Sequence, residues 1–237
     1  MSLPRTLFWA GLGLLVCLWF GSLEVAFSHW GRMPGDGASA ATAERETSHE
    51  PATRNREVGS FTRISDNGSV DLEITIGPQQ SVEVIGDDDA VRKVETSVSG
   101  DELVVSQRDS MWSWTSGDVK VKVTVPKLDA VNLQGSGDAT IAGLDGGNLE
   151  LNSYGSGDFK ASGKVERLTF TSHGSGDGSL EDLEAADAVI KLHGSGDAHV
   201  SASRTLDVET FGSGDVRYSG SPRVSSRITG SGDVSQD

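Results

Sequence analysis

The tetrapeptide Gly-Ser-Gly-Asp occurs six times in this chain, starting at residues 135, 155, 174, 194, 212 and 230. Successive copies begin 18 to 20 residues apart. Fixed periods of about 20 residues are typical of stacked repeats, which bury a core only against their neighbours. The spacing therefore predicts a solenoid, and function has to be sought on the surface of that solenoid.

The residues around each tetrapeptide alternate between apolar and polar. Four residues before successive copies stand Val131, Leu151, Phe170, Ile190 and Val208. A period of two indicates a strand with one buried face. Each repeat is interpreted as strand, corner, strand and second turn, with only a weak helix candidate at Leu180 to Ala188. The fold class predicted from this pattern is all-β, a single-domain parallel β-solenoid with coils of about 18–20 residues.

The composition of the corner fits a sharp bend. Glycine allows positive φ, and Ser and Asp side chains bond neighbouring backbone groups. Residues 57–134 lack the tetrapeptide but keep the alternation, so they are predicted to form the first coils and the cap of the same domain. Within them, Ser99-Gly100-Asp101 and Ser116-Gly117-Asp118 are interpreted as degenerate corners.

Three features together resemble a known bacterial family. They are the strand ending in Val123-Thr124-Val125-Pro126-Lys127-Leu128, the serial corners, and the closing segment from Gly212 to Val224. This combination is similar to the head GIN domain of autotransporter-adhesin-like proteins, over about residues 57–237. The resemblance implies a right-handed parallel β-helix and an adhesive role. It supplies no catalytic residues.

The first 56 residues predict export. Residues Leu7 to Leu23 are almost wholly apolar, which suits either an uncleaved membrane-anchoring helix or a cleaved signal peptide, and both remain open. Residues 29–56 contain few large aliphatic side chains and are expected to be a disordered tether. The predicted organisation is an export segment at 1–28, a linker at 29–56 and the β-helix at 57–237. The single cysteine, Cys17, lies in the apolar run, so no disulfide is expected.

The charge of the chain excludes some partners. Its formal net charge is −15, which argues against binding to nucleic acid and against charge-driven adhesion to anionic lipid.

One aspartate per corner forms a predicted column: Asp138, Asp158, Asp177, Asp197, Asp215 and Asp233. Stacked coils would bring neighbouring carboxylates to about 5 Å, where their repulsion needs relief. The preferred interpretation is that the carboxylates reach water or accept hydrogen bonds from corner amides. Bridging calcium is the alternative, but it is disfavoured because calcium-binding β-rolls use a different, tandem motif. No metal or other cofactor is therefore predicted.

A second column stands directly before the corners: Gln134, Tyr154, His173, His193, Phe211 and Thr229. A stacking ladder is preferred over a metal pair at His173 and His193, since further ligands would have to converge there. Trp112 and Trp114 share one face of an extended segment. They are interpreted as a cap on the core, or alternatively as an exposed anchor for a sugar or a protein.

No signature of a hydrolase, metalloprotease or nucleotide-binding enzyme occurs in the sequence. We therefore predict an exported cell-envelope module for binding, adhesion or structure, without catalytic residues, whose partner is an envelope protein or a glycan. One alternative is a polysaccharide-active β-helix enzyme, an idea that rests on fold analogy. Another is a membrane-tethered partner in envelope-stress signalling.

Overall fold

The computed structural model describes residues 52–108 and 119–237, which belong to one compact unit. This part is a β-solenoid of about five turns with a single short helix, α1 (Asp88–Val91). The predicted all-β, single-domain solenoid is confirmed. The expected N-terminal helix and most of the expected tether lie outside the described residues. Within the described part, no helix is long and apolar enough to cross a membrane.

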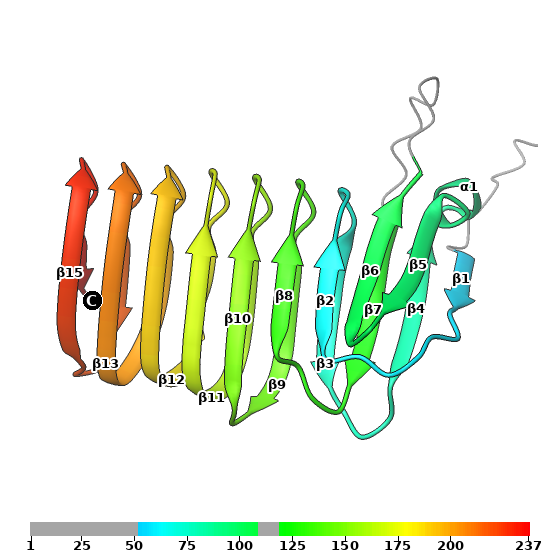
Figure 1. Ribbon diagram of the computed structural model, residues 1–237, viewed down its shortest axis with the longest axis horizontal. Coiled ribbons are helices and arrows are strands. Elements are labelled where there is room, and N and C mark those ends of the chain that lie inside the picture. Colours follow the sequence, from blue (N-terminus) through cyan, green and yellow to red (C-terminus); the bar gives the residue numbers. More distant parts are fainter. Residues whose placement is uncertain (1–51, 109–118) are drawn as a thin grey trace, which may run out of the picture. The chain divides into compact units, whose positions relative to one another are not determined.

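The strands fall into an N-terminal group and a repeat group (Figure 1). The N-terminal group is β1 (Ala52–Asn55), β2 (Arg63–Asp66), β3 (Asp71–Ile76), β4 (Ser81–Gly86), β5 (Val94–Ser99), β6 (Glu102–Gln107) and β7 (Val119–Val125). The repeat group is β8 (Ala130–Leu133), β9 (Ala139–Asp145), β10 (Asn148–Ser153), β11 (Phe159–Ser172), β12 (Gly178–Gly194), β13 (Ala198–Gly212), β14 (Val216–Ser219), β15 (Arg223–Gly230) and β16 (Val234–Gln236). Strand β1 begins inside the segment that composition assigns to the tether.

The repeat coils stack in parallel register, as the period predicts. Leu151 on β10 pairs with Val131 on β8 and with Phe170 on β11, and the column continues through Ile190 to Val208. All five side chains are buried. Burial of every second residue on each strand explains why the apolar positions recur with period two.

Each coil contributes to two walls that share the core. The wall before the corners contains β8 and β10, and the wall after them contains β9; the long strands β11, β12 and β13 bend from one wall to the other. The weak helix candidate at Leu180 to Ala188 is wrong, because this segment is the bend of β12. The register with β13 shifts between Leu180 and Glu184, and the shift brings Leu183 to the core three residues after Leu180.

The N-terminal strands do not stack in chain order. Strand β2 lies between β6 and β8, and β3 lies between β7 and β9, all paired in parallel. The coil made of β6 and β7 therefore stacks on the side of the β2–β3 coil that faces away from the repeats, although it follows that coil in sequence. Strands β4 and β5 then add antiparallel to β7 and β6, and β1 adds antiparallel to β4. The described residues of 57–134 thus form the first coils and an antiparallel cap of the same solenoid.

One of the two proposed degenerate corners is wrong. Ser99-Gly100-Asp101 is the turn of the antiparallel β5–β6 hairpin, in which Ser99 pairs with Glu102. Gly100 there has a φ of 65°, a left-handed conformation that favours glycine. The other, Ser116-Gly117-Asp118, lies outside the described residues.

Candidate binding edge along the corners

The Gly-Ser-Gly-Asp corners lie side by side along one edge of the solenoid, where the chain passes from one wall to the other (Figure 1). Close stacking explains their glycines better than positive φ does. A Cβ atom on Gly174 would lie 2.1 Å from the carbonyl oxygen of Gly155 in the preceding coil. Gly174 itself is not among the glycines with positive φ. The expectation that the corner glycines allow positive φ is therefore wrong for Gly174, where the absence of a side chain is what matters, but it holds for Gly212 and Gly230, whose φ values are 143° and 139°.

The aspartate column forms a continuous hydrogen-bond ladder. The Oδ1 atom of Asp138 accepts the backbone N–H of Asp158 at 2.9 Å, and that of Asp158 accepts the N–H of Asp177 at 2.7 Å. The same bond recurs from Asp177 onward at 2.7, 2.8 and 2.9 Å, as far as Asp233. The side chain thus satisfies an amide at a point where the corner interrupts the strand ladder. This confirms the interpretation that the carboxylates accept hydrogen bonds from corner amides.

The ladder begins one coil earlier than the tetrapeptide. Asp71 accepts the N–H of Asp138 at 3.1 Å, so Gly68-Ser69-Val70-Asp71 occupies the place of a corner. Sequence analysis missed this member because Val70 replaces the second glycine. The signal was present, since Gly68, Ser69 and Asp71 keep the other three residues of the motif.

The corner serines act through their backbone. The N–H of Ser175 donates to the carbonyl oxygen of Gly155 at 3.0 Å, and Ser195 repeats the bond with Gly174 at 3.0 Å. Their side chains are exposed. A row of hydroxyl groups therefore runs along the edge beside the carboxylates.

The column before the corners is a stack of four rings. Tyr154 and His173 have ring centroids 5.0 Å apart, His173 and His193 4.7 Å, and His193 and Phe211 5.1 Å, with interplanar angles of 5° to 10°. The predicted stacking ladder is confirmed. Tyr154 is 52% exposed and Phe211 is 40% exposed, so both ends of the stack are accessible to solvent.

The described residues contain no group of three or more His, Cys, Asp or Glu side chains that could hold a metal ion. His173 and His193 lie face to face, and neither contacts a further ligand of that kind. Trp112 and Trp114 lie outside the described residues, so their two interpretations remain predictions.

A protein-family model described as "Putative auto-transporter adhesin, head GIN domain" matches residues 60–222. The chain belongs to this head GIN family. The predicted resemblance is thereby confirmed over both the N-terminal coils and the repeats.

A solved structure with a TM-score above 0.5 shows the same fold for this head GIN chain. A "putative adhesin" from Bacteroides fragilis aligns with a TM-score of 0.65 and 22% identity, over 80% of this chain and 98% of that chain. A "putative lipid binding protein" and a "putative adhesin", both from Parabacteroides distasonis, align with TM-scores of 0.48 and 0.44 at 24% and 19% identity. Both of these alignments cover 80% of this chain and 98% of the other. No curated protein sequence matches the chain.

Proposed function

We propose that this head GIN domain is an exported cell-envelope binding module that attaches to a glycan or an envelope protein through the edge of stacked rings. The observation that carries the proposal is the solvent-exposed stack of Tyr154, His173, His193 and Phe211. Large exposed aromatic side chains away from a core are typical of binding surfaces. The adhesin description of the family points in the same direction.

The edge suits a ligand that offers both an apolar face and hydroxyl groups. The exposed parts of the rings provide apolar surface, while the neighbouring serine hydroxyls and the second carboxylate oxygens of the aspartate ladder provide donors and acceptors. Sugars combine these two properties, so a glycan is the preferred ligand. Because equivalent groups recur from coil to coil at about 4.8 Å, an extended ligand can lie along several coils.

Export and domain organisation are part of the same proposal. The apolar run at Leu7 to Leu23 supports a leader or an anchor within 1–28, followed by a linker that holds the β-helix at 57–237 away from the membrane. Right-handed winding of the coils is proposed on the general preference for right-handed connections between parallel strands.

A polysaccharide-active enzyme is the weaker alternative. A glycosidase needs two carboxyl groups in different environments, one of them protonated. The aspartates of the ladder share a single environment, with each carboxylate bonded to the next amide. The one carboxyl whose pKa is raised among the described residues, Asp66, is fully buried and cannot reach a substrate. Envelope-stress signalling has no specific observation in its favour.

The test is binding of the full chain to an array of immobilised glycans. The double variant Tyr154→Ala with Phe211→Ala removes the two exposed ends of the ring stack. Val224→Ala with Ile228→Ala is the matched control, because these side chains on β15 are also exposed, at 37% and 39%. We expect the ring variant to lose glycan binding and the control to keep it. Equal binding by both variants would contradict the ring edge as the binding site, and the absence of any glycan bound by the wild type would contradict a glycan ligand.

A further inference from the structure

A polar pocket of about 680 Å³ lies in the N-terminal cap. One side is lined by Arg54, Arg56 and Glu57, which follow or belong to β1, and the other includes Arg92 and residues of β5. Pockets of about 300–1,000 Å³ are the usual size for small-molecule sites. The cap therefore offers space for a ligand, separate from the edge of stacked rings.

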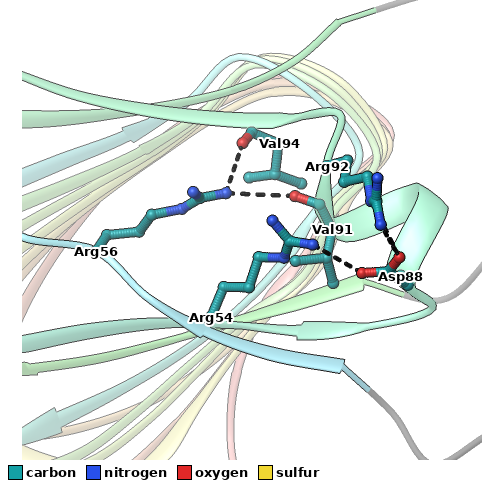
Figure 2. Close-up of polar contacts among 6 residues, drawn as sticks. All are labelled: Arg54, Arg56, Asp88, Val91, Arg92 and Val94. Carbon is teal, nitrogen blue, oxygen red and sulfur yellow. Dashed lines mark hydrogen bonds and ion pairs between the residues drawn. The ribbon is translucent and has the colours of Figure 1, made fainter.

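Three arginine side chains line this pocket, and two of them, Arg54 and Arg92, bind the same carboxylate, that of Asp88 (Figure 2). Arg54 donates from Nη2 to Oδ1 of Asp88 at 2.8 Å, and Arg92 donates from Nε to Oδ2 of the same residue at 3.0 Å. These bonds lower the pKa of Asp88, which keeps its carboxylate ionised. Each guanidinium has five N–H donors, so both arginines retain donors for a further partner. Their side chains are 41% and 61% exposed, and hence accessible to a ligand.

The third arginine has no carboxylate partner among the described residues. Arg56 donates from Nη2 to the carbonyl oxygens of Val91 at 3.3 Å and Val94 at 3.1 Å (Figure 2). Its Nε atom is buried without any hydrogen-bond partner. Carbonyl groups orient a guanidinium but do not cancel its charge, and an uncompensated charge in a partly buried place favours a counterion.

Acidic groups on or beside the pocket wall do not neutralise the positive charge of Arg56. Glu95 is engaged by Arg108 in an ion pair, and Asp88 is shared by Arg54 and Arg92. Glu57 is the remaining carboxylate of the lining. In a chain whose formal net charge is −15, a pocket lined by three arginines and two glutamates is a local exception.

We propose that this pocket binds the carboxylate of an acidic sugar. Arginine pairs with carboxylates through two parallel hydrogen bonds, and Arg54 and Arg56, two residues apart in the chain, both line the pocket. The lining also includes Thr96, Ser97 and Ser106, whose hydroxyls match the hydroxyl groups of a sugar ring. Inorganic phosphate shares the negative charge but has no sugar ring whose hydroxyl groups could pair with those of Thr96, Ser97 and Ser106. A sugar acid is therefore favoured.

The test uses the purified full chain in detergent solution and calorimetric titration with sodium galacturonate. Galactose, inorganic phosphate and sodium chloride are titrated separately at constant ionic strength, since screening would otherwise mimic competition. Arg54→Gln and Arg92→Gln remove exposed donors. Arg204→Gln is the matched control, because this exposed arginine pairs with Asp187 on the solenoid wall in the same way.

We expect saturable binding of galacturonate and not of galactose. Loss of one charged hydrogen-bonding partner weakens such binding about tenfold or more. Arg54→Gln and Arg92→Gln should each show that loss, while Arg204→Gln should bind as the wild type does. No saturable binding of galacturonate, an equal loss in Arg204→Gln, or binding of phosphate alone would overturn the assignment. None of these outcomes bears on the proposed ring-edge site, because that proposal is tested with variants of different residues.

Discussion

The carboxylate of Asp158 accepts the backbone N–H of Asp177 at 2.7 Å, and so joins two coils through a side chain where their strands are interrupted. The same coils are joined next to this bond by the N–H of Phe159, which donates to the carbonyl oxygen of Asp177 at 2.9 Å. With the N–H of Ser175, which donates to the carbonyl oxygen of Gly155 at 3.0 Å, three hydrogen bonds join these two corners. An aspartate at every corner thus continues the ladder through a bend that would otherwise leave amides unpaired.

We predict that Asp158→Ala destabilises the fold and that Asp158→Asn does so much less. Alanine leaves the amide of Asp177 without its acceptor, whereas the side-chain oxygen of asparagine can still accept that hydrogen bond. The expected loss for alanine is about 1 kcal/mol in the free energy of unfolding. Urea denaturation of both variants measures the difference. Equal stability of the alanine and asparagine variants would show that the side-chain acceptor is dispensable.

Because of the aspartate ladder, we predict that calcium has little effect on the melting temperature. One oxygen of each carboxylate from Asp71 to Asp215 is already engaged by an amide of the next coil. We expect millimolar calcium to change the melting temperature by less than about 2 °C relative to a chelator, because a ligand stabilises only what it binds. A rise of more than about 10 °C that disappears when Asp158 and Asp177 become Asn would instead indicate bridging ions.

Phe170 is predicted to be a major contributor to core stability. It is fully buried and packs edge-on against Phe159, with ring centroids 6.0 Å apart at 82°. Phe170→Ala should lower the free energy of unfolding by about 3–5 kcal/mol.

A double-mutant cycle with Gly178 tests whether the loss of stability in Phe170→Ala comes from the packing of the Phe170 ring against Gly178. A Cβ atom on Gly178 would lie 2.7 Å from Cε1 of Phe170, so Gly178→Ala alone should destabilise the protein through overpacking. In the Phe170→Ala background the same substitution should cost less, because the opposing ring is gone. Strictly additive effects in thermal or urea unfolding would contradict this packing.

We predict that the ionisation of Asp66 makes the free energy of unfolding fall as the pH rises. It is fully buried, and neither carboxylate oxygen has a hydrogen-bond partner among the described residues. Burial raises its pKa to about 6, only partly offset by the nearby amides of Val70 and Gly68. The cost of ionising it is absent below the unfolded value, near 4, and complete above about 6.

The matched variant is Asp66→Asn, which cannot ionise. Relative to the wild type, this variant should gain stability between pH 4 and pH 7, by on the order of 2–3 kcal/mol. Subtracting the two pH profiles of unfolding free energy cancels the titration of the other groups. A difference that does not change with pH would contradict an ionisation of Asp66 in this range.

Particular residues show which parts of the structure could be predicted from the sequence. The period of the tetrapeptide and the alternation around it were sufficient for the register from Val131 to Val208, because parallel stacking of equal coils leaves one in-register arrangement. The ring stack and the aspartate ladder followed from the same register. Repeats make contacts between neighbours in sequence, and such contacts can be predicted from one coil.

The tertiary structure alone decided the arrangement that breaks the repeat. No local pattern indicates that the coil of β6 and β7 stacks beyond that of β2 and β3, since β3, β6 and β7 have similar alternation and β2 has a single apolar residue, Ile64. The meeting of Arg54, Arg92 and Asp88 depends on how β1 and α1 come together in the cap. The burial of Asp66 opposite Leu133 is likewise a result of pairing between distant strands. The sequence determined the repeating interior through its period, while contacts between segments far apart in the chain decided the cap, the pocket and the buried carboxylate.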